Sequence, residues 1–223
     1  MSKQESAAWG RPSSYEARWP ASVAVLAALL LYVILPKELT LGPLWLVPVL
    51  ELTLLVPLAV AGSHPGLLDH TWVRKMAITL IAVVNAANVA SLVLLVHELF
   101  VHGSHMVGQR LFFSSASIWL TNVIVYALWY WELDRGGPVD RRRARHQPPD
   151  FLFPQMVTPE SAPKDWSPIF MDYLYVAFTN ATAFSPTDTM PLTVWAKTLM
   201  GIQSLVSLLT VALVAARAVN ILT

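Results

Sequence analysis

Five long apolar segments restrict the fold of this 223-residue chain more than any other feature of its sequence. A helix that crosses a bilayer needs roughly 20 mostly apolar residues, and each segment approaches or exceeds that length. The segments are Trp19–Pro36, Leu41–Ala61, Met76–Phe100, Leu111–Leu133 and Val194–Leu222. Charged residues make up 13% of the chain, whereas soluble domains average about 25%. The sequence therefore predicts an all-α, multi-pass protein of a cell membrane with five transmembrane helices.

The chain divides into four parts around these segments. We expect a polar N-terminal tail over 1–18, a four-helix transmembrane region over 19–133, a polar loop over 134–166 and a pore-type region over 167–223. The loop is rich in Pro, Arg and Asp and has too few apolar residues to bury a core, which predicts a solvated connection. The run "ASVAVLAALLLYVIL" has no small-x-small cleavage site directly after it, which favours an uncleaved first helix over a signal peptide.

A short apolar segment, "SPIFMDYLYVAFTNAT", precedes the last transmembrane segment. Ser167 is a good N-cap and Pro168 a good first helical residue, so we expect a helix that runs to about Thr182. Some 15 residues reach only about 22 Å, short of the roughly 30 Å hydrocarbon core. The segment also carries Asp172 and Asn180. A re-entrant helix that returns as a polar loop fits these features better than a sixth span.

The loop after this helix reads "NATAFSPTD" and continues as "MPLTVWAK". This run resembles the pore module of the potassium-channel-like superfamily, in which T-A-T-T-V-G-Y-G-D precedes a Pro, a Thr and a basic residue. The residues in register with that pattern are Ala181, Thr182, Asp188, Pro191, Thr193, Ala196 and Lys197. The segment "DYLYVAFT" is also similar to a family of uncharacterised bacterial inner-membrane proteins. These resemblances imply a bacterial inner membrane, monovalent cations as permeant ions and a homo-oligomer, most simply a tetramer, around one pore.

The loop departs from the channel pattern where ion selectivity is set. Ser185 and Thr187 replace the two glycines, and Pro186 fixes φ and lacks an N–H group. A ladder of backbone carbonyls that would select potassium is therefore not expected. Hydroxyl groups and one carboxylate take its place. The candidate ion-binding residues are Thr182, Ala183, Phe184, Ser185, Pro186, Thr187 and Asp188.

Two functions remain open for this loop. Lined with hydroxyls and a carboxylate, it would form a weakly selective cation pathway. With Phe184 and Pro186 packed into a closed bundle, it would instead be a plug in a non-conducting scaffold or accessory subunit.

Glu51 lies in the middle of the second apolar segment. A carboxylate there is costly unless it is paired, protonated or facing water. One interpretation is a neutral side chain that is hydrogen-bonded to a neighbouring helix. The other is the centre of a proton-coupled carrier.

Polar residues also recur in the last span. Gln203 and Ser207 are four residues apart and share one helix face. Such residues either join helices through hydrogen bonds or line a pore. Asn85, Asn88 and Asn122, in the third and fourth spans, favour the joining of helices.

The distribution of Lys and Arg predicts the orientation of the chain. With five spans, twelve of these residues lie on the side of the N-terminus and three on the other. Because cytoplasmic loops carry the excess of positive charge, the N-terminus is expected in the cytoplasm and the pore loop would enter from there. The channel resemblance implies the opposite, since the pore loop of a potassium channel enters from outside.

Several function classes are not expected. The sequence has no nucleophile elbow, phosphate-binding glycine loop or dinucleotide fingerprint, so we expect neither an enzyme nor a cofactor. It has no cysteine, and in "HELFVH" the histidine His102 comes one residue too late for a zinc motif with His97. We expect no metal site and no nucleic-acid partner, and the lipid bilayer is the principal partner.

Overall fold

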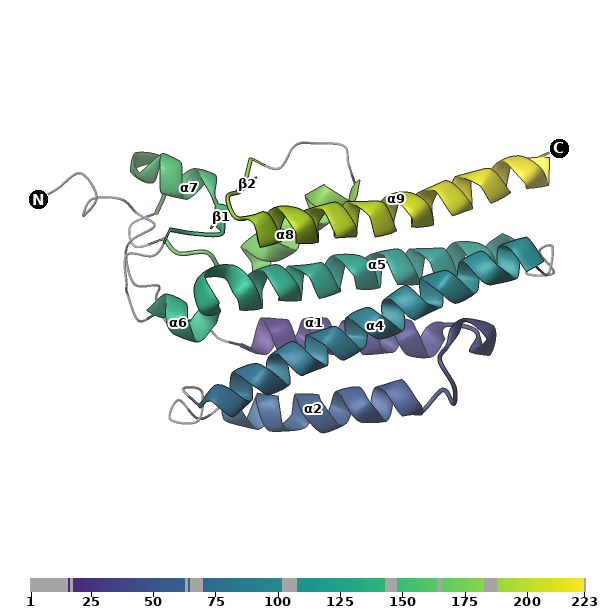
Figure 1. The fold of residues 1–223 in the computed structure, drawn as a ribbon, viewed down its shortest axis with the longest axis horizontal. Helices are drawn as coiled ribbons and strands as arrows, with labels where there is room; N and C mark the ends of the chain where they lie inside the picture. Colours follow the sequence, from purple (N-terminus) through teal and green to yellow (C-terminus); the bar gives the residue numbers. More distant parts are fainter. Residues whose placement is uncertain are drawn as a thin grey trace, which may run out of the picture.

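A computed structural model of the chain describes residues 16, 18–62, 64, 70–101, 108–142, 148–163, 166–182 and 188–222. The protein is mostly helical (Figure 1). Three of the described helices are long and apolar enough to cross a membrane: α4 (Thr71–Val101), α5 (Gly108–Leu133) and α9 (Val194–Leu222). The membrane character predicted from the apolar segments is therefore confirmed for these three helices.

Two further apolar helices, α1 (Trp19–Ile34) and α2 (Leu46–Gly62), are shorter, with 16 and 17 residues. The helix α1 ends before Pro36, and Leu35 is already extended because a residue before proline avoids the helical region. A single 3-10 turn, η2 (Lys37–Leu39), follows. The expected second segment loses its first five residues, since Gly42 has a positive φ of 66° and Pro43 comes next.

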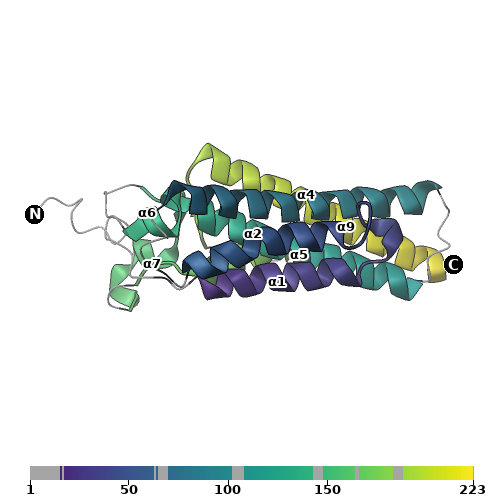
Figure 2. The same cartoon turned by 90° about the horizontal axis from the view of Figure 1, so that it is seen from below.

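The helix α5 lies at the centre of the bundle. It contacts α1, α4, α8 (Phe170–Thr182) and α9, whereas α2 packs on the outside against α1 and α4 (Figure 2). The fully buried side chains Ile118, Val125 and Tyr130 of α5 explain this position. These contacts make α5 the helix to which the other parts of the bundle are joined.

One end of the bundle is closed by short elements, which we call the cap (residues 134–163; Figure 1). The cap consists of η3 (Asp134–Gly136), α6 (Pro138–Arg142), β1 (Phe151–Leu152), α7 (Pro154–Val157) and η4 (Pro159–Ser161). Phe151, Phe153 and Met156 are buried in the main hydrophobic core. The expectation of a solvated loop is wrong for these residues, because the few apolar side chains of the segment extend the core of the bundle instead of forming their own.

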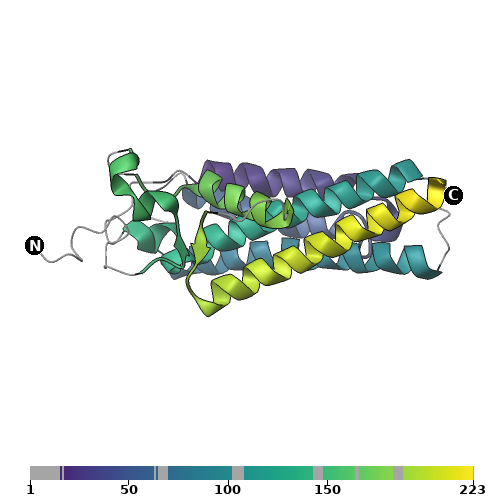
Figure 3. The same ribbon diagram turned by 90° about the horizontal axis from the view of Figure 1, so that it is seen from above.

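The helix α8 starts at the cap and does not cross the bundle. It has 13 residues, or about 20 Å, and begins three residues after Ser167, the expected N-cap. The next described strand, β2 (Met190–Pro191), pairs with β1 of the cap, so the chain has returned to the end at which α8 began (Figures 1 and 3). From there α9 runs the length of the bundle.

Candidate functional site

The structure describes the two ends of the predicted pore loop. Ala183, Phe184, Ser185, Pro186 and Thr187 lie outside the described residues. Thr182 is the last residue of α8, and its hydroxyl group donates to the carbonyl oxygen of Thr179 at 3.0 Å. Asp188, on the other side of the loop, is exposed and precedes β2. The loop therefore joins the inner end of α8 to the cap end of the bundle.

Gln203 of α9 is completely buried where α5, α8 and α9 meet. Its Nε2 atom donates to the carbonyl oxygen of Ala177 at 2.8 Å. Its Oε1 atom accepts from the hydroxyl group of Tyr130 at 2.6 Å and from Nδ2 of Asn180 at 2.7 Å. A single amide thus joins α9 to the middle of α8 and to α5.

Further hydrogen bonds extend from Gln203 along α9. Asn180 also donates to the carbonyl oxygen of Met200 at 3.0 Å, and Ser204 donates to Oδ1 of Asn180 at 3.1 Å. One turn farther on, Nδ2 of Asn122 in α5 donates to the hydroxyl group of Ser207 at 2.9 Å. We call this set the amide network, and its members are Asn122, Tyr130, Asn180, Gln203, Ser204 and Ser207.

The amide network buries the polar side chains of α9 between helices of the same chain. Gln203 and Ser207 are 0% and 2% exposed, so within this chain they hold helices together, which was one of their two expected roles. Neither side chain reaches a surface that a second copy could share. The outward face of α9 is apolar and includes Leu205, Leu208 and Val211.

A second polar cluster holds the cap to the bundle. Asp134 is fully buried, and its Oδ2 atom accepts from the hydroxyl group of Tyr173 in α8 at 2.6 Å. Its Oδ1 atom accepts from the backbone N–H of Asp150 at 2.9 Å. The carboxylate of Asp150 in turn accepts from the backbone N–H of Arg135 at 2.8 Å and from Nε1 of Trp195 at 2.9 Å. Two carboxylates therefore connect the end of α5, the start of α8 and the start of α9.

Arg141 and Glu16 complete this cap cluster. The Nη1 atom of Arg141 donates to the carbonyl oxygens of Trp131 and Asp134, and Nη2 lies 3.4 Å from Oε2 of Glu16. The Oε1 atom of Glu16 accepts from Nε1 of Trp131 and from the backbone N–H of Phe170. A residue that precedes the first helix therefore satisfies the first backbone donor of α8.

The electrostatics of the cap cluster follow from its burial. Burial alone would lower the pKa of Arg141, but Tyr173, Asp134 and Glu16 together raise it above its usual value, so the guanidinium remains charged. Burial raises the pKa of Glu16, and the nearby Arg141 and the two N–H donors offset part of that rise. The cluster therefore contains buried ion pairs between Arg141 and Glu16 and between Arg135 and Asp134.

The sequence patterns did not single out Asp134, Arg141 or Asp150. A signal was present in "DRGG", because consecutive glycines indicate a turn that other residues avoid. Gly136 and Gly137 have φ values of 81° and 93°, and a Cβ atom on Gly137 would lie 2.8 Å from the carbonyl oxygen of Glu132. This turn brings the chain back so that Arg141 lies beneath the end of α5.

Glu51 lies in α2 and is 1% exposed. One turn away on either side, Val47 and Leu55 belong to hydrophobic clusters that include residues of α1 and α4, so Glu51 lies on the face of α2 that is turned to these two helices. Its Oε2 atom has no hydrogen-bond partner among the described residues, and neither does Nδ2 of the buried Asn88 in α4. The hydrogen bond to a neighbouring helix that one of the two interpretations of Glu51 requires is not formed at this oxygen.

No metal-binding group of three or more His, Asp or Glu side chains is found in the part of the chain that the structure describes. Comparisons with protein-family models, with curated proteins and with solved structures gave no match.

Proposed function

We propose that this chain is a membrane protein in which α5, α8 and α9 form a pore-type unit, and that several copies form a weakly selective cation pathway. The observation that carries this proposal is that α8 begins at the cap end and that the next described strand, β2, pairs with β1 at that same end; we call residues 170–191 the hairpin. Polar, non-helical backbone at membrane depth requires cover from protein or from a water-filled cavity. A pore shared between copies, most simply four, supplies that cover.

The proposed topology has five spans and one re-entrant helix. The helices α1 and α2 are about 24–26 Å long, a few ångströms short of the hydrocarbon core, and local thinning of the bilayer accommodates such a mismatch. The cap end carries Arg18, Arg74, Lys75 and Lys197, which supports a cytoplasmic cap and N-terminus in a bacterial inner membrane.

The chemistry of the hairpin favours cations. The C-terminal end of α8 presents the partial negative charge of the helix dipole to the loop that follows. Asp188 adds an exposed carboxylate at the end of the loop. The hydroxyl groups of Ser185 and Thr187 lie between these two features in the sequence. Monovalent cations that remain partly hydrated suit such a site better than fully dehydrated potassium.

The test is cation flux into liposomes that contain the purified full-length chain. We expect flux of both potassium and sodium, reduced about tenfold in Asp188→Asn and less in Ser185→Ala. Glu160→Gln is the matched control, because it removes one exposed carboxylate from the cap, outside the hairpin. Flux that is the same in wild type, Asp188→Asn and Ser185→Ala would contradict the proposed pathway.

Orientation has its own test, since the native chain has no cysteine. A single cysteine is introduced at Glu160 in the cap or at Lys37 at the opposite end. In right-side-out vesicles we expect an impermeant maleimide to label the cysteine at position 37 and not the one at position 160. The reverse pattern would place the cap outside, as the channel resemblance implies.

A non-conducting scaffold is the second candidate, and the burial of Gln203 and Ser207 favours it. In a scaffold the amide network only fixes α8, and the liposomes show no flux above empty controls. A proton-coupled carrier is the third candidate, favoured by the unpartnered Oε2 atom of the buried Glu51. A carrier predicts pH-dependent uptake that Glu51→Gln abolishes and Asp188→Asn leaves intact.

A further inference from the structure

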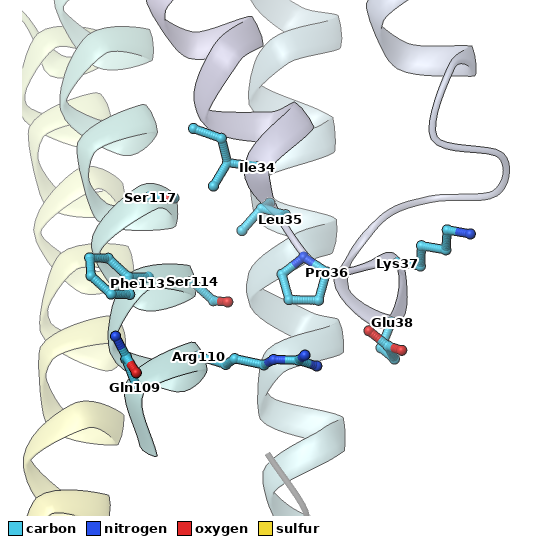
Figure 4. Close-up of a pocket in the computed structure, with 10 residues that line it drawn as sticks. All are labelled: Ile34, Leu35, Pro36, Lys37, Glu38, Gln109, Arg110, Phe113, Ser114 and Ser117. Atoms are coloured by element: carbon cyan, nitrogen blue, oxygen red, sulfur yellow. The ribbon is translucent and has the colours of Figure 1, made fainter. Parts of the chain in front are cut away.

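A pocket of about 570 Å³ lies at the end of the bundle opposite the cap. The end of α1, the η2 turn and the first three turns of α5 surround it (Figure 4). In a bilayer-spanning bundle these segments lie at the level of the lipid headgroups. The position therefore selects ligands that come from, or accumulate at, the membrane surface.

One side of the pocket is charged and polar. Arg110 of α5 extends across the pocket toward Pro36 and Glu38 of the opposite wall (Figure 4). Among the described residues Arg110 has no hydrogen bond or ion pair, and the same holds for Glu38. Ser114 and Ser117 add hydroxyl groups from side chains that are 3% and 7% exposed. A free guanidinium group is well suited to a phosphate group, which it binds with two parallel hydrogen bonds.

The other side of the pocket is apolar. Ile34 and Leu35 come from the last turn of α1 and its C-cap, and Phe113 comes from α5 (Figure 4). Ile34 is 69% exposed and Phe113 is 56% exposed, so this wall continues onto the outer surface of the bundle. A ligand that fits both sides has a compact polar head and an apolar tail that leaves the pocket along α1 and α5.

We propose that this pocket binds one phospholipid through its phosphoethanolamine headgroup. Arg110 holds the phosphate group, Glu38 pairs with the ammonium group, and Ser114 and Ser117 supply hydroxyl groups to the glycerol ester region. An acyl chain lies along Ile34, Leu35 and Phe113. The acidic Glu38 distinguishes this headgroup from an anionic glycerol headgroup, which has no cation to offer a carboxylate. This site is independent of the cation pathway and exists in a non-conducting scaffold as well.

The test is native mass spectrometry of the full-length chain in detergent, titrated with phosphatidylethanolamine. We expect saturable binding of one lipid per chain, weakened about tenfold or more in Arg110→Gln, because the charge-assisted hydrogen bonds to the phosphate group are lost. Phe113→Ala weakens binding about threefold, since part of the acyl contact is lost. Lys75→Gln is the matched control: it removes an exposed cation from α4 at the cap end, away from the residues that line the pocket. Its affinity should remain within about twofold of wild type.

Glu38→Gln and two further ligands test the headgroup assignment. We expect Glu38→Gln to weaken binding of phosphatidylethanolamine and to leave binding of phosphatidylglycerol unchanged. Tighter binding of phosphatidylglycerol than of phosphatidylethanolamine to the wild-type chain would overturn the assignment. Competition by glycerophosphoethanolamine at equal concentration would show that the site takes a soluble headgroup and not a lipid. Equal binding by wild type and Arg110→Gln would overturn the site itself.

Discussion

Two polar sites inside the bundle differ in how fully their hydrogen-bonding atoms are used. At the interface of α8 and α9, the amide of Gln203 makes three hydrogen bonds to two neighbouring helices. In α2 and α4, Oε2 of Glu51, Nδ2 of Asn88 and the hydroxyl group of Ser91 have no partner among the described residues. All of these side chains are nearly or completely buried.

The effect of a buried polar residue on helix packing therefore depends on whether its hydrogen-bonding atoms have partners. In the amide network the central amide of Gln203 is satisfied, although Oδ1 of Asn122 has no partner among the described residues. Such a network specifies one arrangement of the helices, because any shift breaks several hydrogen bonds together. A buried group without a partner costs about 1–3 kcal/mol and favours no particular arrangement. The amide network therefore sets the position of α8, whereas apolar contacts set the position of α2.

Among the proposed substitutions, Gln203→Leu is expected to change the free energy of unfolding most. The substitution leaves Tyr130 and Asn180 without their acceptor, so we expect the free energy of unfolding to fall by about 2–3 kcal/mol. Titration of the folded chain with a denaturing detergent measures this loss. Ile202→Ala is the control on the same helix, because Ile202 is 46% exposed. A loss of less than about 0.5 kcal/mol in Gln203→Leu would show that the network does not hold α8.

Glu51→Met tests the effect on stability of a buried polar group that has no partner. Methionine fills a similar volume without an unsatisfied oxygen, so we expect stability to rise by about 1 kcal/mol in the same titration. A clear loss of stability would mean that Glu51 has a partner in the assembled protein, which would favour the proton-coupled carrier.

A matched pair of asparagines gives a smaller effect. Asn122→Ala removes the hydrogen bond to Ser207 and should cost about 1 kcal/mol. Asn88→Ala removes an amide that makes no hydrogen bond with the described residues, so it should change stability by no more than about 0.5 kcal/mol. Equal losses of stability in Asn122→Ala and Asn88→Ala would contradict the difference between hydrogen-bonded and unpartnered buried groups.

The smallest effect concerns pH and the cap cluster. Because the pKa of Glu16 is raised on folding, its protonated form stabilises the folded chain at low pH, and this contribution is lost as pH rises above the ordinary value of 4.5. The stability of wild type relative to Glu16→Gln should therefore decrease as pH rises from about 4 towards neutral. Detergent titrations at several pH values measure the difference. An increase over that range would mean that Arg141 outweighs the burial of Glu16.

The sequence predicted those parts of the fold that depend on local patterns. Apolar length located α4, α5 and α9, and the spacing of Gln203 and Ser207 placed both side chains on one face. Their spacing did not indicate whether this face of α9 would contact other helices of the chain or a pore, so both roles remained open. The burial of Asp134 and Arg141 depends on contacts with Glu16 and Tyr173 that are distant in sequence, and no periodicity records such contacts.

The contact between Glu16 and Phe170 has a consequence for biosynthesis. These residues are separated by 154 positions, so Glu16 leaves the ribosome long before the backbone donor that it accepts from has been made. The cap consequently closes only when nearly the whole chain has been translated and inserted. A chain arrested before α8 lacks the Phe170 N–H that donates to Glu16 and the Tyr173 ring that lies 5.3 Å from the guanidinium of Arg141, and its unfinished cap distinguishes it from the complete protein.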